Sequence, residues 1–151
     1  KKVFSKKVII IKGGKERSDS SLKGLKYIKK FKPNNVLIHD AARPNFSIKL
    51  LKKLINKLKK NKAVVPYIYS NDSIKYNSQN RLFNLNRNKA FLTQTPQGFK
   101  YNDLYKLAIN QKNKITDEAT LFIDNDFNVN FVKGENKNNK ITFKNDIKLL
   151  L

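Results

Sequence analysis

The feature that most constrains the fold of this chain is the alternation of two apolar patterns along it. Short apolar or β-branched runs at 7–11, 35–40 and 62–69 are typical of buried strands. Between them, at 20–31 and 47–60, apolar residues recur every three or four positions, which indicates amphipathic helices. Strands that alternate with helices predict an α/β protein with a largely parallel sheet.

The segment 47–60 shows the helical pattern most clearly. Pro44 suits the entry to this helix, because its fixed φ angle and missing N–H cost nothing in a first turn. Lysines largely occupy the face opposite the apolar one, so we expect the helix to lie on the sheet. The apolar face consists of Ile48, Leu51, Leu54, Ile55 and Leu58.

The second half of the chain continues the alternation. We expect a strand and then a loop at 90–99, a helix at 101–112 and a strand at 127–134. Further helices begin within 116–125, where Asp and Glu suit the first turn, and within 144–151.

The segment 71–87 differs from the rest, because it reads as two short polar strands about a turn with few core-forming side chains. We predict that it projects from the body. The whole chain, 1–151, is otherwise expected to form a single domain, since it contains neither repeats nor a linker.

The composition argues against several kinds of site. The chain has no cysteine, so it has no disulfide and no thiolate metal site, and its only histidine, His39, argues against a histidine zinc site or a Ser-His-Asp triad. No apolar run approaches membrane-spanning length and no signal peptide opens the chain, so we expect a cytoplasmic protein with no membrane partner. The chain also lacks methionine, and we expect it to be a piece of a longer polypeptide.

The net charge of +22 predicts attraction to polyanions, among them nucleic acid and phosphorylated small molecules. The lysines are spread along the chain, however, and heavy use of Lys, Asn and Ile is also what an AT-rich coding sequence produces. A basic nucleic-acid-binding module remains an alternative, but the chain shows no aromatic and basic interleaving of the RNA-binding kind.

Polar residues follow the predicted strands, and in α/β sheets ligands bind beyond the carboxyl ends of the strands. Asp40 follows the second predicted strand and is a candidate Mg²⁺ ligand, since magnesium takes one or two carboxylates with phosphates and waters. Arg43 fits either a phosphate or a pair with Asp40. Helix capping for Asp40, and an ordinary tight turn for Gly13 and Gly14, are the alternatives for each residue taken alone.

Together these residues suggest a metal- and phosphate-dependent site without a covalent nucleophile. Phosphoryl-type transfer fits, because that chemistry asks mainly for positioning and charge neutralisation. We expect His39 to pack or to hydrogen-bond within its strand. Further polar groups at strand ends are Ser73, Lys75, Thr95, Thr116 and Lys140.

Six motifs in order carry a resemblance that covers essentially the whole chain, of which HDAARP and QTPQGF are the most specific pair. The chain resembles the 2-C-methyl-D-erythritol 4-phosphate cytidylyltransferase family, which implies a Rossmann-like nucleotidyltransferase sheet. The motifs are GGKERSDSSLKGL (13–25), VLIHDAARP (36–44), NDSIK (71–75), QTPQGF (94–99), TDEA (116–119) and NNKIT (138–142).

The resemblance implies that CTP and methylerythritol phosphate react, with Mg²⁺ assisting, to give cytidine-diphospho-methylerythritol and pyrophosphate. It assigns the catalytic roles to Lys140, Arg87 and Asp40, and the metal to Asp40. The implied nucleotide contacts are Gly13, Gly14, Ser20, Asp40 and Ala41. The implied substrate contacts are Arg43, Ser73, Arg87, Thr95, Thr116, Lys140 and Thr142.

The family is a homodimer in which a β-arm reaches into the partner's site. By this likeness the arm is about 71–89, and Ser73 and Arg87 act in trans. Two residues depart mildly from the family pattern: Ser73 stands where threonine is usual, and Lys15 where an acidic residue often follows the glycines.

The larger departure is at the front, where nothing matches the family's first strand and its glycine-rich triphosphate loop. We therefore expect this chain alone to be inactive or nearly so. A cytidylyltransferase for another polyol phosphate, such as ribitol 5-phosphate, and a noncatalytic remnant of the fold are the other readings of the same motifs.

Overall fold

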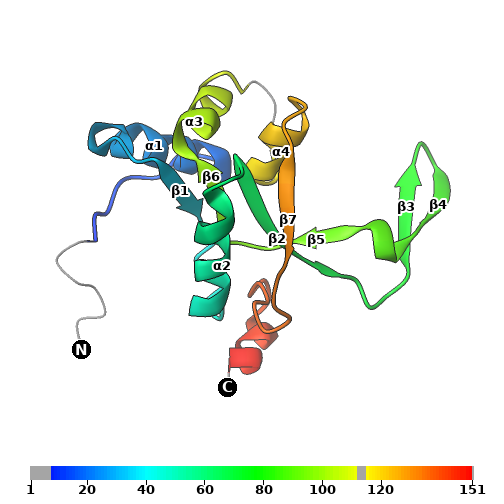
Figure 1. Cartoon of the computed structure of the whole chain (residues 1–151). Helices are drawn as coiled ribbons and strands as arrows, with labels where there is room; N and C mark the ends of the chain where they lie inside the picture. Colours follow the sequence, from blue (N-terminus) through cyan, green and yellow to red (C-terminus); the bar gives the residue numbers. More distant parts are fainter. Residues whose placement is uncertain (1–7, 112–114, 151) are drawn as a thin grey trace.

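The computed structural model describes residues 8–111 and 115–150 and has a mixed α/β fold (Figure 1). A five-stranded sheet forms its centre, with strand order β1-β6-β2-β5 and with β7 paired to β2. The strands are β1 (Asn35–Ile38), β2 (Ala63–Tyr69), β5 (Phe91–Thr93), β6 (Gln97–Lys100) and β7 (Val129–Lys133).

Helices cover both faces of this sheet, because neighbouring residues of a strand point to opposite faces. Val64 of β2 packs under the apolar side of α2 (Ile48–Leu58), whereas Ala63 lies in a second core cluster with residues of the other three helices. These are α1 (Arg17–Ile28), α3 (Tyr101–Ile109) and α4 (Glu118–Ile123). The α/β class predicted from the alternating patterns is confirmed.

The prediction of a largely parallel sheet is wrong. Among the strands of the central sheet that the structure describes, only β2 and β7 pair in parallel; the pairs β1–β6, β2–β6 and β2–β5 are antiparallel. A strand and then a loop are predicted at 90–99, but residues 91–100 instead run back along β2 as two successive strands. They pair first with Tyr67–Tyr69 and then with Ala63 and Val64. A chain that returns directly along its neighbour must run antiparallel to it.

The strand expected at 7–11 is also not observed over residues 8–11, and Lys7 lies outside the described residues. Val8 to Ile11 have no strand assignment, and Ile10 is 89% exposed. A β-branched run favours a strand only where a neighbouring strand edge is available to pair with it, and none of the described strands pairs with this run.

The helices agree with the sequence patterns within a few residues at their ends. α1 begins at Arg17 rather than at residue 20. A capping box between Glu16 and Asp19 satisfies the backbone groups of its first turn. α3 ends at Ile109, and residue 112 of the predicted helix lies outside the described residues. The last segment forms a 3₁₀-helix, η3 (Lys144–Leu150), rather than an α-helix, and Leu151 is outside the description.

The predicted projecting hairpin is confirmed. Strands β3 (Ile74–Ser78) and β4 (Arg81–Leu85) form a separate antiparallel ribbon that extends away from the body in Figure 1. Its tip is a two-residue turn in which Gln79 and Asn80 both have positive φ, as the twist of a hairpin favours. A short 3₁₀-helix, η2 (Arg87–Lys89), follows the ribbon.

Candidate functional site

The centre of the candidate site is the carboxylate of Asp40, directly beyond the end of β1. Three cationic side chains surround it: Arg17 Nε lies 3.1 Å from Oδ1, and Lys140 Nζ lies 3.6 Å from Oδ2. Arg43 Nε is 4.0 Å from the same Oδ2. Segments that are up to 123 residues apart in the sequence therefore place their charges around one carboxylate.

Burial raises the pKa of the Asp40 carboxyl, but the hydrogen bond from Arg17 and the charges of Arg17, Lys140 and Arg43 lower the pKa by more. The net pKa lies below the ordinary aspartate value. Asp40 is therefore fully ionised at neutral pH, and the surplus of positive charge around it favours an additional anion.

Thr95 fixes the backbone at Asp40, because its hydroxyl accepts the Asp40 N–H at 3.0 Å. The same hydroxyl lies 3.1 Å from Nδ1 of His39, whose Nε2 lies 2.9 Å from the carbonyl oxygen of Arg43. His39 also packs edge-on against Phe46. The expectation that His39 packs or hydrogen-bonds is thus confirmed. Thr95 is only 4% exposed, so the hydroxyl that holds the backbone of Asp40 is itself fixed in the interior.

Arg43 is held by two backbone carbonyls. Its Nη1 donates to Asn138 at 2.8 Å and its Nη2 to Thr93 at 3.5 Å. The sequence left open whether Arg43 binds a phosphate or pairs with Asp40. In the structure its Nε lies at the long ion-pair distance of 4.0 Å from Asp40, and its bond to the Asn138 carbonyl holds the loop that carries Lys140.

Asn138 anchors that loop. Its side chain is completely buried and donates to the carbonyl of Thr95 at 2.8 Å, and Ile141 N–H donates to the carbonyl of Ala42 at 2.8 Å. Between these two points Lys140 presents a half-exposed side chain beside Asp40. The loop is therefore fixed while its lysine stays accessible to a ligand.

Three of the five residues assigned to the nucleotide, Asp40 among them, line one groove. A groove of about 530 Å³ runs between α1 and β1, lined among others by Ser20, Asp40 and Ala41. Gly14 donates its N–H to Ser20 Oγ at 2.9 Å, and a Cβ on Gly14 would lie 2.1 Å from the Asp19 side chain. Close packing against α1 thus requires glycine at position 14, while Gly13 is exposed.

The other predicted substrate residues are more dispersed. Thr142 is exposed, and its N–H donates to Asp146; Thr116 is exposed and directly precedes Asp117, the N-cap of α4. Ser73 and Arg87 belong to the arm region, where Arg87 donates to the carbonyl of Asn71. In the described part of the chain neither contacts the Asp40 group.

The described residues contain no group of three or more His, Asp or Glu side chains suited to a metal ion. Asp40 offers a single carboxylate, which fits Mg²⁺ only if phosphate oxygens and waters supply most of its ligands. No helix in the described ranges is long and apolar enough to cross a bilayer.

Two residues of the site were not singled out by the sequence analysis. Arg17 forks onto both Asp40 and Glu118, and Glu118 is 1% exposed although its position in a first helical turn predicts a solvated dipole partner. Arg17 lies within the GGKERSDSS segment, directly after the N-cap Glu16. A basic residue in the first turn of a helix is unusual, and this was the signal that could have marked Arg17 as a site residue.

The fold and the site together define an α/β protein with three cationic side chains gathered around one carboxylate at the end of a central strand. The profile of the family described as 2-C-methyl-D-erythritol 4-phosphate cytidylyltransferase (IspD) matches residues 1–150. The chain belongs to this family.

Similar proteins agree with this assignment. The chain is 47% identical to a bifunctional enzyme IspD/IspF of Pelagibacter ubique over 98% of its own length and 40% of that protein. It is 36% identical to a 2-C-methyl-D-erythritol 4-phosphate cytidylyltransferase of Thermosipho melanesiensis over 99% of the chain and 68% of that protein.

Solved structures show the same fold. The 4-diphosphocytidyl-2C-methyl-D-erythritol synthase of Anaerococcus prevotii matches with a TM-score of 0.84 and 35% identity, covering 91% of this chain and 63% of that one. The bifunctional IspDF of Campylobacter jejuni matches with a TM-score of 0.82 and 33% identity, over 97% and 37% of the two chains. The chain thus spans between about two fifths and two thirds of the length of these relatives.

Proposed function

We propose that this domain serves the transfer of a cytidylyl group from CTP to 2-C-methyl-D-erythritol 4-phosphate. The observation that carries the proposal is the Asp40 group itself: one ionised carboxylate, two arginines and one accessible lysine, held on the fold of a cytidylyltransferase family. An excess of fixed positive charge at the end of a strand is what a phosphorylated substrate requires.

In the proposed reaction an oxygen of the substrate's own phosphate attacks the α-phosphorus of CTP. A new P–O bond forms, the bond between the α-phosphorus and the bridging oxygen breaks, and pyrophosphate leaves with the electron pair. Lys140 neutralises charge on the attacking phosphate and on the α-phosphate, and Arg43 holds the methylerythritol. Such a transfer depends mainly on positioning and electrostatics, so the lack of a covalent nucleophile in this group is no obstacle.

Asp40 is the residue that would hold Mg²⁺, together with oxygens of the nucleotide. The ion, when bound, neutralises phosphate charge and thereby favours the approach of two anions. The contacts of Asp40 Oδ2 with Arg43 and Lys140 are long, at 4.0 and 3.6 Å, so this oxygen is the one available to an additional ligand.

The cytidine portion of CTP is proposed to lie in the groove between α1 and β1. The argument is that Ser20, Asp40 and Ala41 line the same groove and that Gly14 packs against its helical wall. Thr95, Thr116 and Thr142 stay predictions as phosphate contacts, and a cytoplasmic location stays a prediction as well.

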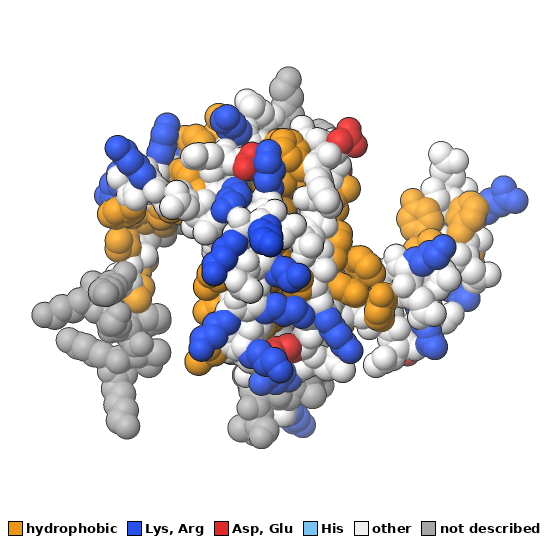
Figure 2. Space-filling model, in the orientation of Figure 1, with side chains coloured by type: hydrophobic (Ala, Val, Ile, Leu, Met, Phe, Trp, Pro, Cys, Tyr) orange, Lys and Arg blue, Asp and Glu red, His pale blue; other side chains and the backbone are white. Residues whose placement is uncertain are grey.

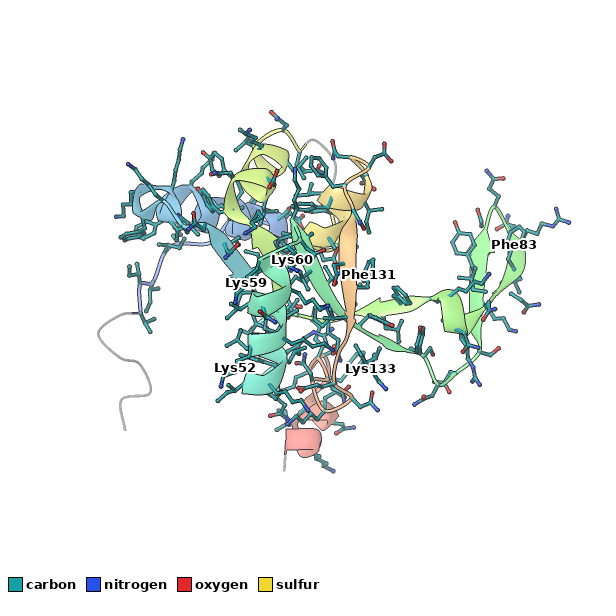
Figure 3. All side chains as sticks on the ribbon, viewed as in Figure 1. Lys52, Lys59, Lys60, Phe83, Phe131 and Lys133 are labelled. Atoms are coloured by element: carbon teal, nitrogen blue, oxygen red, sulfur yellow. The ribbon has the colours of Figure 1, made fainter. Side chains whose placement is uncertain are left out.

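The arm is proposed to complete a partner's site in a homodimer. Apolar side chains that have no core to join gather on the arm and where β2 and β5 leave the body, including Leu82 at 72% and Tyr69 at 47% exposure (Figure 2). Phe131 on β7 and Phe83 on the arm mark the two ends of this region in Figure 3. Contact with a second copy would bury these side chains and bring Ser73 and Arg87 to the partner's Asp40 group.

Calorimetric titration of the chain with methylerythritol phosphate tests the proposed function. We expect saturable binding that Lys140→Ala and Arg43→Ala each weaken about tenfold or more, as the loss of a charged hydrogen bond predicts. Lys60→Ala, which removes an exposed lysine at the far end of α2 (Figure 3), is the matched control and should bind as the parent does.

Equal binding by the Lys140→Ala and Lys60→Ala variants would show that only the general positive charge attracts the ligand, and would overturn the proposal. Ribitol 5-phosphate in place of methylerythritol phosphate separates the two polyol substrates.

Sedimentation of the parent chain and of the Leu82→Lys variant tests the proposed homodimer. We expect the parent to form a dimer that the substitution dissociates, and a monomeric parent would contradict the proposal.

A further inference from the structure

Arg17 links the two halves of the proposed site, yet it is not among the residues assigned to nucleotide or substrate. It is the first residue of α1, the helix that also carries Ser20. Its guanidinium contacts two carboxylates on other elements, Asp40 after β1 and Glu118 at the start of α4.

The geometry of these contacts is that of a fork. Nη1 and Nη2 of Arg17 each lie 2.9 Å from one oxygen of Glu118, while Nε lies 3.1 Å from Oδ1 of Asp40. Nη1 donates a hydrogen bond to Oε1 of Glu118, whereas Nη2 and Oε2 form an ion-pair contact without a hydrogen bond. A planar guanidinium can contact one carboxylate in this way and still present its Nε–H to another. Glu118 is 1% exposed, so its carboxylate is a fixed, buried partner for the partly exposed Arg17 side chain.

The consequence for Asp40 is a fixed orientation. Arg17 occupies Oδ1, and the other oxygen, Oδ2, is thereby turned toward Arg43 and Lys140. Without Arg17 the carboxylate has two cations on one side and none on the other, so nothing would hold it in this rotamer.

We propose that Arg17, itself held by the buried Glu118, is a positioning residue that turns Asp40 Oδ2 toward Arg43 and Lys140, the two cations proposed to contact the substrate, and so couples α1 to the substrate half of the site. This inference rests on the proposed function. It assigns Arg17 no contact with the reacting atoms, and its effect on the ligand passes through Asp40.

The test removes the fork without leaving a buried charge unpaired. The double variant Arg17→Met/Glu118→Gln deletes one cation and one anion, so the net charge stays at +22. The matched control is Lys62→Met/Asp103→Asn, which deletes the 3.1 Å ion pair near the opposite end of β1. Binding of methylerythritol phosphate is measured for both, for the parent, and for each in an Asp40→Asn background.

We expect the fork variant to bind about tenfold more weakly and the control to bind as the parent does. In the Asp40→Asn background the fork variant should cause no further loss, because its effect acts through Asp40. Arg17→Lys, which keeps a cation for Glu118 but cannot fork, should fold and should weaken binding to a similar extent.

Two results would overturn the inference: binding by the fork variant equal to that of the parent, or an equal loss with and without Asp40. The second result would show a general structural effect. If the parent itself fails to bind methylerythritol phosphate, the proposed function fails instead, and the two failures are thereby distinguished. Should the double variant not fold, the Arg17→Lys comparison in the two backgrounds decides alone.

Discussion

At the scale of single residues, the site depends on buried polar groups as much as on its charges. Asp40 keeps its place because Thr95 accepts its N–H, and Thr95 in turn has its carbonyl bonded by the side chain of Asn138. Two of these three residues are nearly or completely buried. In such surroundings an unpaired polar group is costly, so each link in this chain of contacts stabilises the next.

Asn138→Ala should therefore destabilise the protein by about 1–3 kcal/mol, because it removes a buried hydrogen bond and leaves the Thr95 carbonyl without a donor. Urea unfolding followed by circular dichroism measures the change. Asn139→Ala, at the exposed neighbouring position, is the control and should change the free energy of unfolding by less than about 0.5 kcal/mol. Equal effects of the two substitutions would contradict the role of Asn138.

A second prediction at this scale concerns pH. The N–H groups of Phe143 and Thr142 donate to Asp146, which lowers the pKa of its carboxyl below the ordinary aspartate value. A carboxyl with a lowered pKa in the folded state stabilises above its unfolded pKa, and this contribution is lost as the pH falls through the folded pKa.

Carbon NMR should thus give a midpoint for Asp146 below about 3.9, and the amide signals of Thr142 and Phe143 should move with the same midpoint. Asp146→Asn keeps an acceptor but does not titrate, so the amide shifts should then stay constant across this range. A midpoint at or above the ordinary aspartate value is the result that excludes these bonds in solution.

At the scale of elements, the helices owe their positions to packing more than to their own propensities. α2 turns its lysines outward and buries Leu54 and Leu58, as its pattern predicts. For Ile48 and Ile55 the predicted apolar face is wrong: they are 71% and 45% exposed, and Leu50 is buried instead, because the sheet covers a face rotated toward Leu50. Figure 3 labels Lys52 on this helix and Lys59 and Lys60 directly beyond its C-terminal end. α1 has a weaker apolar pattern, and among its residues only Leu25 is fully buried.

Two glycines test how tightly the helices are packed: Gly24 lies within α1, and Gly98 lies on β6 against α2. A Cβ on Gly24 would meet no atom within 4 Å, so Gly24→Ala should stabilise the protein by about 0.5–1 kcal/mol through helix propensity and reduced unfolded-state entropy. Gly98→Ala is the contrasting variant. There a Cβ would lie 2.8 Å from the Leu58 side chain, so α2 or the sheet would have to shift and the protein should be destabilised.

Thermal unfolding of both variants measures these changes. A Gly24→Ala protein less stable than its parent would show that α1 is not a regular helix at that point, and a neutral Gly98→Ala would show that α2 can move without cost.

At the scale of the whole molecule, the net charge of +22 is carried by only 151 residues and must oppose compaction. Screening by salt should weaken this repulsion, since the Debye length falls to about 8 Å near physiological ionic strength. We therefore expect the melting temperature to rise between about 0.05 and 0.3 M NaCl.

Lys52→Glu, on the outer face of α2, should reduce the salt dependence, whereas Lys52→Arg should leave it unchanged. Differential scanning fluorimetry of the three proteins compares them. A melting temperature that falls with added salt would mean that favourable ion pairs, such as those of Arg17, outweigh the repulsion.

Several features of the molecule could be predicted from local pattern. The alternation of patterns predicts the helices and the class, the polar character of 71–87 predicts the projecting hairpin, and HDAARP with QTPQGF indicates the family. These signals are local, because the 3.6-residue and two-residue periods, hairpin turns and short motifs each lie within one stretch of chain.

Strand direction and the identity of buried charges were decided by the tertiary structure alone. The segment 91–100 carries no local signal that it returns antiparallel along β2, and Val8 to Ile11 have strand propensity without a paired edge. The sequence context of Glu118 predicts a solvated first-turn residue, but Glu118 is 1% exposed and pairs with Arg17, 101 positions away. The sequence by itself determined the helices, the projecting hairpin and the family. The three-dimensional packing decided which runs become strands, how the strands pair and which distant charges meet at Asp40, because these depend on contacts between segments far apart in the chain.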